Sequence, residues 1–259
     1  MQSVNTNENI NLVNPHLDGG PFFWRGGSTG ILLIHGFTAT TAEVRPLAIK
    51  LAEAGYSVSG PLLPGHNTDP RDLNRVTWRD WVDCVELSYE ELRITCQKVI
   101  IGGESTGGLL ALYLALFHPE VSALLLYAPA LQLNLSKSEI LKMHLVAPVR
   151  QWIPKENLDS RDNWQGYFVN PLKGAIQLLK LQNQVRPNLS KIHQPVLIVQ
   201  GRLDSTVHPL VPDTIYQQVS STIKEEYWME KSAHCVVLDQ ELTQVAEITT
   251  AFLERVLKQ

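Results

Sequence analysis

Short apolar runs alternate along the chain with longer segments whose apolar residues recur at helical spacing. The short runs are rich in Val, Ile and Leu, which is typical of strands buried on both faces of a parallel sheet. Such runs predict strands at residues 31–34, 56–63, 123–128, 195–200 and 225–229, and one more that begins at Lys98. A short edge strand is also expected at Pro21–Trp24.

Helices are predicted between these strands, at residues 77–92, 109–117 and 242–257 and after the first buried strand. Thr40 and Glu43 have the spacing of a capping box for this first helix. Its regular part is expected to begin at Pro46 and to end at Gly55. Because helical crossovers join parallel strands and cover both faces of their sheet, the pattern predicts an α/β fold with a mostly parallel central sheet.

The alternation stops between residues 131 and 190, where two helical stretches appear with no strong strand between them. Ser138 is expected to cap the first stretch, which Pro148 ends, and Asn170-Pro171 begins the second. The second stretch has an apolar face made by Leu172, Ala175, Ile176 and Leu179.

This interruption suggests two structural units. We predict a core formed by residues 1–130 and 191–259, and a small helical cap formed by residues 131–190. The apolar faces of the cap either line an acyl pocket or only pack against the core. Trp152 and Trp164 are expected in the loops of this segment.

The segment from Gly103 to Gly107 has the pattern G-x-S-x-G, with a predicted strand before it and a predicted helix after it. A sharp strand-to-helix turn exposes a serine hydroxyl above the sheet, and the two glycines relieve the crowding around it. The N-terminus of the following helix points at a site where negative charge develops. Ser105 is therefore the candidate nucleophile, and an ordinary glycine-rich turn is the alternative.

An acyl-transfer enzyme also needs two N–H donors directed at the developing oxyanion. One usually belongs to the residue after the nucleophile, here Thr106, and the other to a loop after an early strand. The segment His35-Gly36-Phe37-Thr38 follows the first buried strand, so the backbone N–H of Phe37 is the second candidate. The alternative is a plain turn with a packed His35.

Ser105, Asp204 and His234 each follow the end of a predicted strand, and ligands bind at the carboxyl ends of such strands. In this order along the chain they fit a nucleophile, an orienting acid and a general base. Asp239 and Asp213 are competing acids, of which the first is close to His234 in sequence and the second follows two prolines.

His66 is a further candidate base, although a loop histidine near a cleft is more often structural or in contact with substrate. The other histidines, at positions 16, 118, 144, 193 and 208, have no assigned chemical role.

The composition is that of a globular protein, with 259 residues and a net charge of −4, which disfavours nucleic acid as a partner. No apolar run is long enough for a transmembrane helix, and residues 1–20 lack the apolar centre of a signal peptide. Cys84, Cys96 and Cys235 lack CxxC spacing, which favours reduced thiols and a cytoplasmic location. We expect no metal, because HExxH and clustered His/Cys ligands are absent, and no nucleotide cofactor.

The chain resembles the α/β-hydrolases, and among them the small bacterial carboxylesterases related to monoacylglycerol lipases. The resemblance is carried by His35-Gly36-Phe37-Thr38, Pro64-Gly65-His66, residues 103–108, residues 201–207 and the histidine loop at residues 232–239. It implies a cofactor-free serine carboxylesterase of short- to medium-chain esters. Carried over to this chain, it implies a Ser105–Asp204–His234 triad, an oxyanion hole at Phe37 and Thr106, and a small helical cap.

Two positions depart from the family pattern. Glu104 replaces an apolar residue beside the nucleophile, and its side chain is expected to be satisfied away from the site. Ala233 replaces the glycine that commonly precedes the histidine. Neither change removes a catalytic group.

Other functions remain open at this point: a monoacylglycerol lipase, an acyltransferase that uses the same triad, or a non-catalytic binding protein of the same fold. The expected partner is a small-molecule ester, without integral membrane association, and the expected state is a monomer or homodimer. Acyl length, alcohol preference and the docking of the cap do not follow from the sequence.

Overall fold

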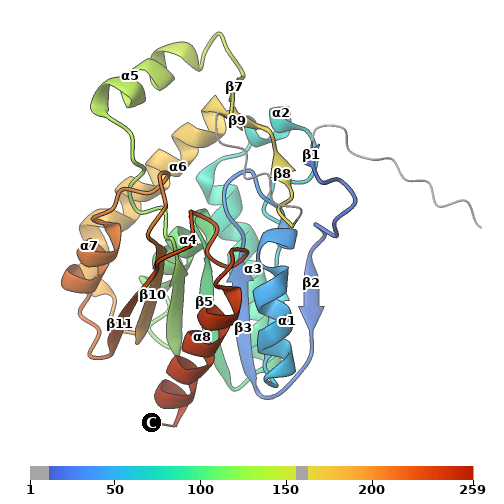
Figure 1. Ribbon diagram of the computed structural model, residues 1–259, viewed down its shortest axis with the longest axis vertical. Coiled ribbons are helices and arrows are strands. Elements are labelled where there is room, and N and C mark those ends of the chain that lie inside the picture. Colours follow the sequence, from blue (N-terminus) through green and yellow to red (C-terminus); the bar gives the residue numbers. More distant parts are fainter. Residues whose placement is uncertain (1–11, 156–162, 259) are drawn as a thin grey trace, which may run out of the picture.

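The computed structural model describes residues 12–155 and 163–258, and within them seven strands form one sheet (Figure 1). Their order is β11-β10-β6-β5-β3-β4-β2, and all neighbours are parallel except β2, which pairs antiparallel with β4. The strands are β2 Phe22–Trp24, β3 Thr29–Ile34, β4 Ser57–Gly60, β5 Lys98–Glu104, β6 Ala123–Tyr127, β10 Val196–Gly201 and β11 Lys224–Met229. The predicted mostly parallel sheet and its edge strand are confirmed. The strand predicted at residues 56–63 is shorter in the structure, because β4 ends at Gly60 and the following Pro61 lacks the N–H that a sheet needs.

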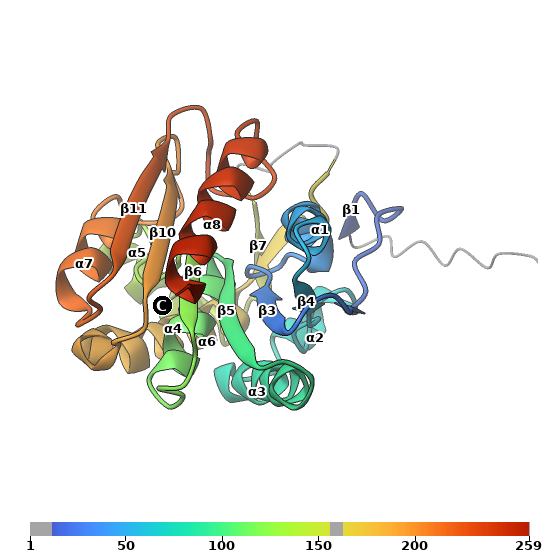
Figure 2. The same cartoon turned by 90° about the horizontal axis from the view of Figure 1, so that it is seen from below.

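Helices cover both faces of this sheet (Figure 2). One face carries α1 (Arg45–Glu53) and α8 (Leu242–Leu257); the other carries α3 (Trp78–Thr95), α4 (Thr106–Ala115), α6 (Leu172–Val185) and α7 (Val211–Gln218).

The strand β3 shows why continuous apolar runs mark these strands. Ile31 and Leu33 lie in the core beneath α1 and α8, whereas Leu32 and Ile34 lie in the core beneath α3 and α4. Successive side chains of a strand point to opposite faces, so a strand covered on both sides is apolar at every position.

Several short elements were not predicted from the sequence. They are β1 Leu12–Val13, α2 Pro70–Leu73, β7 Trp152–Pro154, β8 Gly166–Tyr167, β9 Val169–Pro171 and η2 Arg186–Lys191, together with α7. A single turn, η1 Thr41–Glu43, precedes α1, in line with the expectation that the regular helix begins only near Pro46. The strand β1 pairs with β8, and β7 pairs with β9. Trp152 therefore lies in a strand rather than in the expected loop.

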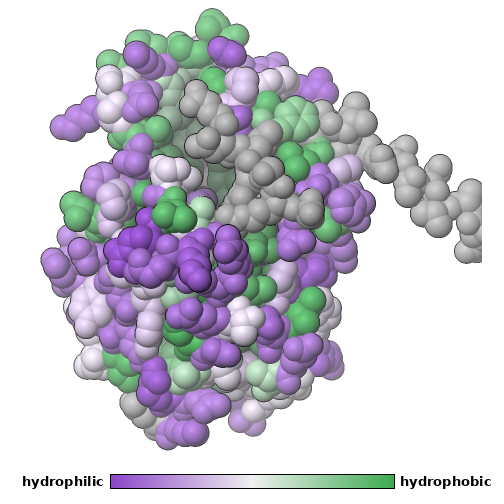
Figure 3. Space-filling model, in the orientation of Figure 1, coloured by the Kyte–Doolittle hydropathy of each residue, from purple (hydrophilic) through white to green (hydrophobic). Residues whose placement is uncertain are grey.

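The helix α5 (Lys137–Val146) lies apart from the sheet, at the top of Figure 1. Its N-cap is Ser136 rather than Ser138, because Ser136 and Glu139 form a capping box: the N–H of Glu139 donates to Ser136 Oγ at 3.2 Å and the N–H of Ser136 donates to Glu139 Oε2 at 2.8 Å. Every residue of α5 is at least partly exposed, and Leu141 and Leu145 are exposed by more than half. Figure 3 shows apolar surface at the top of the molecule, the end at which α5 lies in Figure 1.

The helix α6 begins after Pro171, as its sequence predicts. On the predicted apolar face Leu172 and Leu179 are buried, but Ala175 and Ile176 are only half-buried. The residues through which α6 joins the main core are Leu178, Leu181 and Val185.

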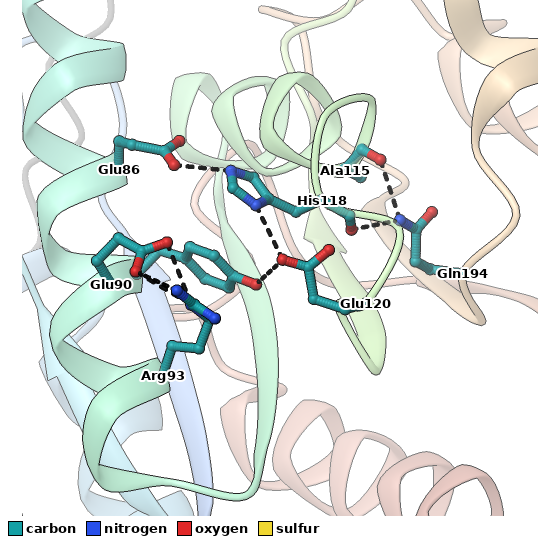
Figure 4. A network of polar contacts seen from close by, with 8 residues as sticks. Glu86, Glu90, Arg93, Ala115, His118, Glu120 and Gln194 are labelled. Carbon is teal, nitrogen blue, oxygen red and sulfur yellow. Dashed lines mark hydrogen bonds and ion pairs between the residues drawn. The ribbon is translucent and has the colours of Figure 1, made fainter.

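A polar network fastens the far end of α4 to α3 (Figure 4). The imidazole of His118 contacts Glu86 through Nε2 at 2.7 Å and Glu120 through Nδ1 at 3.1 Å, and the hydroxyl of Tyr89 donates to Glu120 at 2.8 Å. The side-chain amide of Gln194 donates to the carbonyl of His118 at 2.9 Å. Because α4 runs from Ser105 to this end, the network fixes the axis of the helix that follows the candidate nucleophile.

The turn between β5 and α4 lies unusually close to the end of β3. A Cβ atom added to Gly103 would be 2.3 Å from the carbonyl oxygen of Ile34, and one added to Gly107 would be 2.0 Å from the same oxygen. Only glycine permits this approach, since any side chain would overlap the backbone of β3. The contact holds the turn after β5 beside the loop that follows β3.

We predict that Gly107→Ala lowers the free energy of unfolding by about 2–3 kcal/mol, because the new methyl group forces the turn away from β3. Urea unfolding followed by circular dichroism measures this change. The control is Gly20→Ala, whose added Cβ would be 3.4 Å from the nearest atom and which should change stability by less than about 0.5 kcal/mol. Equal effects of the two substitutions would contradict this explanation.

Candidate active site

Ser105 occupies the turn between β5 and α4 with φ of 54° and ψ of −110°. Few residues other than glycine adopt a positive φ, and such strained conformations persist only where the surroundings hold them. Here the N–H of Ser105 donates to the carbonyl of Tyr127 at 2.8 Å, and the carbonyl of Ser105 accepts from the N–H of Ala130 at 2.9 Å. The end of β6 therefore holds the strained serine, with its hydroxyl above the carboxyl end of the sheet.

The structure brings together the three side chains that the sequence analysis singled out. The Nε2 atom of His234 is 2.9 Å from Ser105 Oγ, and its Nδ1 atom is 2.8 Å from Asp204 Oδ2. A carboxylate only accepts, so Nδ1 carries the proton and Nε2 is free to accept from the serine hydroxyl. Such a hydrogen-bond chain can activate a serine hydroxyl as a nucleophile.

Asp204 follows β10 and its side chain is only 1% exposed. Its Oδ1 atom accepts from the N–H groups of Thr206 at 2.7 Å and Val207 at 3.1 Å, and its Oδ2 atom also accepts from the side-chain amide of Gln200 at 2.7 Å. Burial by itself raises the pKa of Asp204, but the charge of His234 and these hydrogen bonds outweigh it, so the pKa is lowered. Asp204 therefore remains ionised beside the imidazole.

The pKa of His234 is shifted in the opposite direction from that of Asp204. Burial lowers its pKa, but the charge of Asp204 and its hydrogen bond prevail, so the pKa of His234 is raised above its ordinary value. A raised pKa makes the ring a stronger base. It also means that the neutral form, which accepts the serine proton, is lost at a higher pH than for a free histidine.

The two competing acids lie elsewhere. Asp213 is exposed on α7, and Asp239 accepts from the N–H of Ala233 through Oδ2 at 2.7 Å. The contact between Asp239 and Ala233 shapes the turn that carries His234. Of the three candidate acids, Asp204 is the one in contact with the His234 ring.

The loop His35-Gly36-Phe37 lies against the nucleophile, because a Cβ added to Gly36 would be 3.2 Å from the Cβ of Ser105. Thr106 is the first residue of α4, so helix geometry leaves its N–H without an intrahelical acceptor. In the described residues neither the N–H of Phe37 nor that of Thr106 donates to another protein group. Both donors are therefore available beside Ser105, where the sequence predicted an oxyanion hole.

His35 is a packed residue that supports this loop. Its Nε2 atom accepts from the N–H of Leu63 at 3.1 Å, and its Nδ1 atom donates to the carbonyl of Gly36 at 2.9 Å. Burial lowers the pKa of His35 to about 4. The packed His35 and the candidate oxyanion loop are thus two features of the same turn.

His66 is buried, and its ring packs beside the rings of His35 and Phe37. Its Nδ1 atom lies 3.1 Å from the carbonyl of Pro64, and its ring centroid lies 4.9 Å from that of His35. Burial lowers the pKa of His66 well below its ordinary value. The ring is therefore a neutral, packed group, in line with the structural interpretation of this residue.

Glu104 is fully buried, and its Oε2 atom accepts from the N–H of Val237 at 3.4 Å. This contact joins Glu104 to the histidine loop. In residues 12–155 and 163–258 no group of three or more His, Cys, Asp or Glu side chains is arranged to hold a metal ion. No helix in these ranges is long and apolar enough to cross a membrane.

The sequence analysis missed the role of Glu43. Its spacing from Thr40 predicts a capping box, but the carboxylate does not return to the helix start. Its Oε2 atom instead accepts from the N–H of Gly36 at 2.6 Å, and its Oε1 atom accepts from the indole N–H of Trp164 at 3.1 Å. Thr40 alone caps the turn, through a bond from the N–H of Ala42 at 3.3 Å. The tertiary partners outcompete the local one, and no local pattern reveals them.

We predict that Asp204→Asn lowers the pKa of His234, because it removes both the negative charge and the acceptor that stabilise the imidazolium. The pKa is read from the pH dependence of the imidazole resonances in NMR spectra. Asp213→Asn is the matched control, since Asp213 is exposed on α7, and it should leave the titration unchanged. A His234 titration that is identical in native protein and Asp204→Asn would contradict the assigned contact.

Comparison with known proteins supports this architecture along nearly the whole chain. A thermostable monoacylglycerol lipase of Bacillus sp. (strain H-257) is 34% identical over 247 residues, which cover 93% of this chain and 97% of the relative. A carboxylesterase of Bacillus subtilis (strain 168) is 29% identical over 242 residues, covering 91% and 96%.

Among solved structures, that of the metagenome-derived lipolytic enzymes LipS and LipT superposes with a TM-score of 0.86 at 28% identity, covering 92% of this chain and 98% of the other. The model of one protein family, described as serine aminopeptidase S33, matches residues 28–241. The chain therefore belongs to the S33 family of serine hydrolases, which have the α/β-hydrolase fold.

Proposed function

We propose that the chain is a serine carboxylesterase that hydrolyses short- to medium-chain carboxylic esters through an acyl-enzyme at Ser105. The observation that carries this proposal is the hydrogen-bond chain from Ser105 through His234 to Asp204, with contacts of 2.9 Å and 2.8 Å. The names of the two Bacillus relatives, a monoacylglycerol lipase and a carboxylesterase, support an ester as the substrate.

The proposed reaction begins when Ser105 Oγ attacks the ester carbonyl and His234 Nε2 takes the hydroxyl proton. The carbonyl oxygen becomes an oxyanion, which the N–H groups of Phe37 and Thr106 stabilise. Asp204 holds the ring with its proton on Nδ1 and stabilises the imidazolium. The carbon–oxygen bond to the alcohol then breaks, and His234 protonates the departing alkoxide.

Water completes the cycle. His234, neutral again, removes a proton from a water molecule as that molecule attacks the acyl-enzyme carbonyl. The second tetrahedral intermediate collapses, Ser105 leaves with the proton held by His234, and the carboxylic acid is released.

We also propose that residues 131–190 act as a cap over this site. The start of α6 contacts the oxyanion loop, since a Cβ added to Gly174 would be 3.2 Å from the ring of Phe37. The side-chain amide of Gln182 on the same helix donates to the carbonyl of Ala130 at 2.8 Å. Half-buried Ala175 and Ile176 lie between these two attachments and offer an apolar wall for an acyl chain.

The remaining expectations stay predictions from the sequence. They are a cytoplasmic location, which the absence of a disulfide at Cys84, Cys96 and Cys235 favours, and a monomeric or homodimeric state. A monoacylglycerol lipase is the second candidate function, favoured by the relative with 34% identity.

The test is turnover of p-nitrophenyl esters from acetate to palmitate by native protein and by Ser105→Ala. We expect turnover of the short and medium esters and a loss of at least about 10³-fold in kcat for the variant, since removing a triad member leaves only binding and oxyanion stabilisation. A maximum at the longest chains favours the lipase over the esterase. Equal, weak rates of native protein and variant would overturn the proposal.

Three further assays distinguish the other candidate functions. An added alcohol that captures the acyl group in preference to water identifies an acyltransferase. Amino-acid p-nitroanilides test peptidase activity, which the family description makes relevant. Saturable ester binding without turnover identifies a binding protein.

A further inference from the structure

A buried carboxylate that the proposed mechanism does not use lies behind the site. Glu43 is only 3% exposed, and hydrogen bonds from three donors converge on its two oxygens. Besides the N–H of Gly36 at 2.6 Å and the indole N–H of Trp164 at 3.1 Å, the thiol of Cys235 donates to it at 3.5 Å. A buried charge is retained only where such partners replace its lost hydration.

The three donors belong to three separate parts of the site. Gly36 directly precedes Phe37, whose N–H is a proposed oxyanion donor. Cys235 directly follows His234, the proposed general base. Trp164 belongs to residues 131–190, the proposed cap. A single side chain therefore joins the oxyanion loop, the histidine loop and the cap segment.

Backbone contacts reinforce the junction between the cap segment and the oxyanion loop. The N–H of Tyr167 donates to the carbonyl of Thr38 at 2.9 Å, and the N–H of Thr40 donates to the carbonyl of Gln165 at 3.1 Å. Thr38 has a φ of 65°, which a β-branched residue adopts only where its neighbours hold it. These bonds therefore attach the oxyanion loop to the cap segment, and the bond from Gly36 attaches it to Glu43.

We propose that Glu43 is a positioning residue for the reaction: its carboxylate fixes the Gly36–Phe37 backbone and the His234 loop relative to one another. This inference rests on the proposed esterase mechanism. Its consequence is that the oxyanion donor and the general base are aligned by one shared group. Displacements of about 1 Å in such groups cost up to about 100-fold in rate.

The donor set favours the ionised form of Glu43, because all three of these partners donate to its oxygens. Burial raises the pKa of Glu43 above its ordinary value, and the bonds from Gly36, Trp164 and Cys235 and the charge of His234 oppose this rise. The charged groups that act on His234 are Asp204 and Glu43, which raise its pKa, and Lys155, which lowers it. In its ionised form Glu43 supports Asp204 in keeping the imidazole basic.

Two substitutions separate charge and hydrogen bonding from mere volume. Glu43→Gln has nearly the same shape, but it is neutral and places an amide NH₂ group against at least one of the donors. Glu43→Asp keeps the charge and both oxygens, with a side chain shorter by one carbon. If Glu43 positions the site, aspartate rescues part of what glutamine loses.

The experiment measures kcat and KM for a p-nitrophenyl ester, and kcat/KM against pH, for native protein and both variants. For Glu43→Gln we expect kcat to fall about 10- to 100-fold with KM changed less than about threefold. The acid limb of its kcat/KM profile should move to lower pH, because His234 loses a nearby negative charge. Glu43→Asp should keep the acid limb of native protein and recover part of kcat.

The matched control is Thr249→Val, which removes a buried polar group on α8 whose hydroxyl lies 2.8 Å from that of Tyr127. It should lower the melting temperature while leaving kcat and the acid limb unchanged. The proposal is overturned if Glu43→Gln lowers only the melting temperature, as Thr249→Val is expected to do. It is also overturned if Glu43→Gln changes KM but not kcat, or if the acid limb of its kcat/KM profile equals that of native protein.

An NMR titration of His234 keeps this inference separate from the proposed function. Native protein without ester turnover overturns the esterase proposal, yet the titration still reports whether Glu43 acts on the imidazole. We expect a lower pKa of His234 in Glu43→Gln than in native protein and in Glu43→Asp. Identical titrations of all three proteins contradict the role of Glu43.

Discussion

The site depends on the contact between the turn after β5 and the end of β3. Gly103 and Gly107 both lie against the carbonyl oxygen of Ile34, closer than any side chain would permit. This contact puts Ser105 beside Gly36, and so places the proposed nucleophile next to the loop that carries the proposed oxyanion donor. The parallel sheet brings Asp204 and His234 to the same place, because β10 and β11 end at the same edge and these two residues follow them.

The elements of the core could be predicted because their sequence signals are local. The apolar run of β3 reports burial on both faces, and the final helix has the same bounds in the sequence pattern and in the structure, Leu242–Leu257. Ser105, Asp204 and His234 were found for a related reason. Each is a reactive residue type within five residues of the end of a strand, where the topology of a parallel sheet brings distant positions together.

What the sequence did not reveal depends on tertiary contacts or on short-range competition. Ser136 and Ser138 are both plausible caps, and only the reach of Glu139 selects the first. The helix α7 was missed although Pro212 lies in its first turn, where the fixed φ of proline is compatible with a helix.

Glu43 illustrates the same limit at the site itself. Its sequence spacing fits a local cap, yet its partners Trp164 and Cys235 are 121 and 192 residues away along the chain. A carboxylate this deeply buried is costly, and it is compensated by donors that the fold brings from three directions. Glu43 thus bonds both to the loop proposed to hold the oxyanion and to the loop of the proposed base, and no motif identifies it.

The most direct test of the account is covalent labelling with diethyl p-nitrophenyl phosphate, followed by mass spectrometry of the intact and digested protein. The serine oxygen attacks phosphorus, His234 takes its proton, and p-nitrophenolate leaves. The account predicts a single diethylphosphoryl group on the peptide that contains Ser105, release of an equivalent of p-nitrophenol, and no label in Ser105→Ala. Native protein that stays unlabelled, or a label that forms on another residue and persists in the variant, would contradict it.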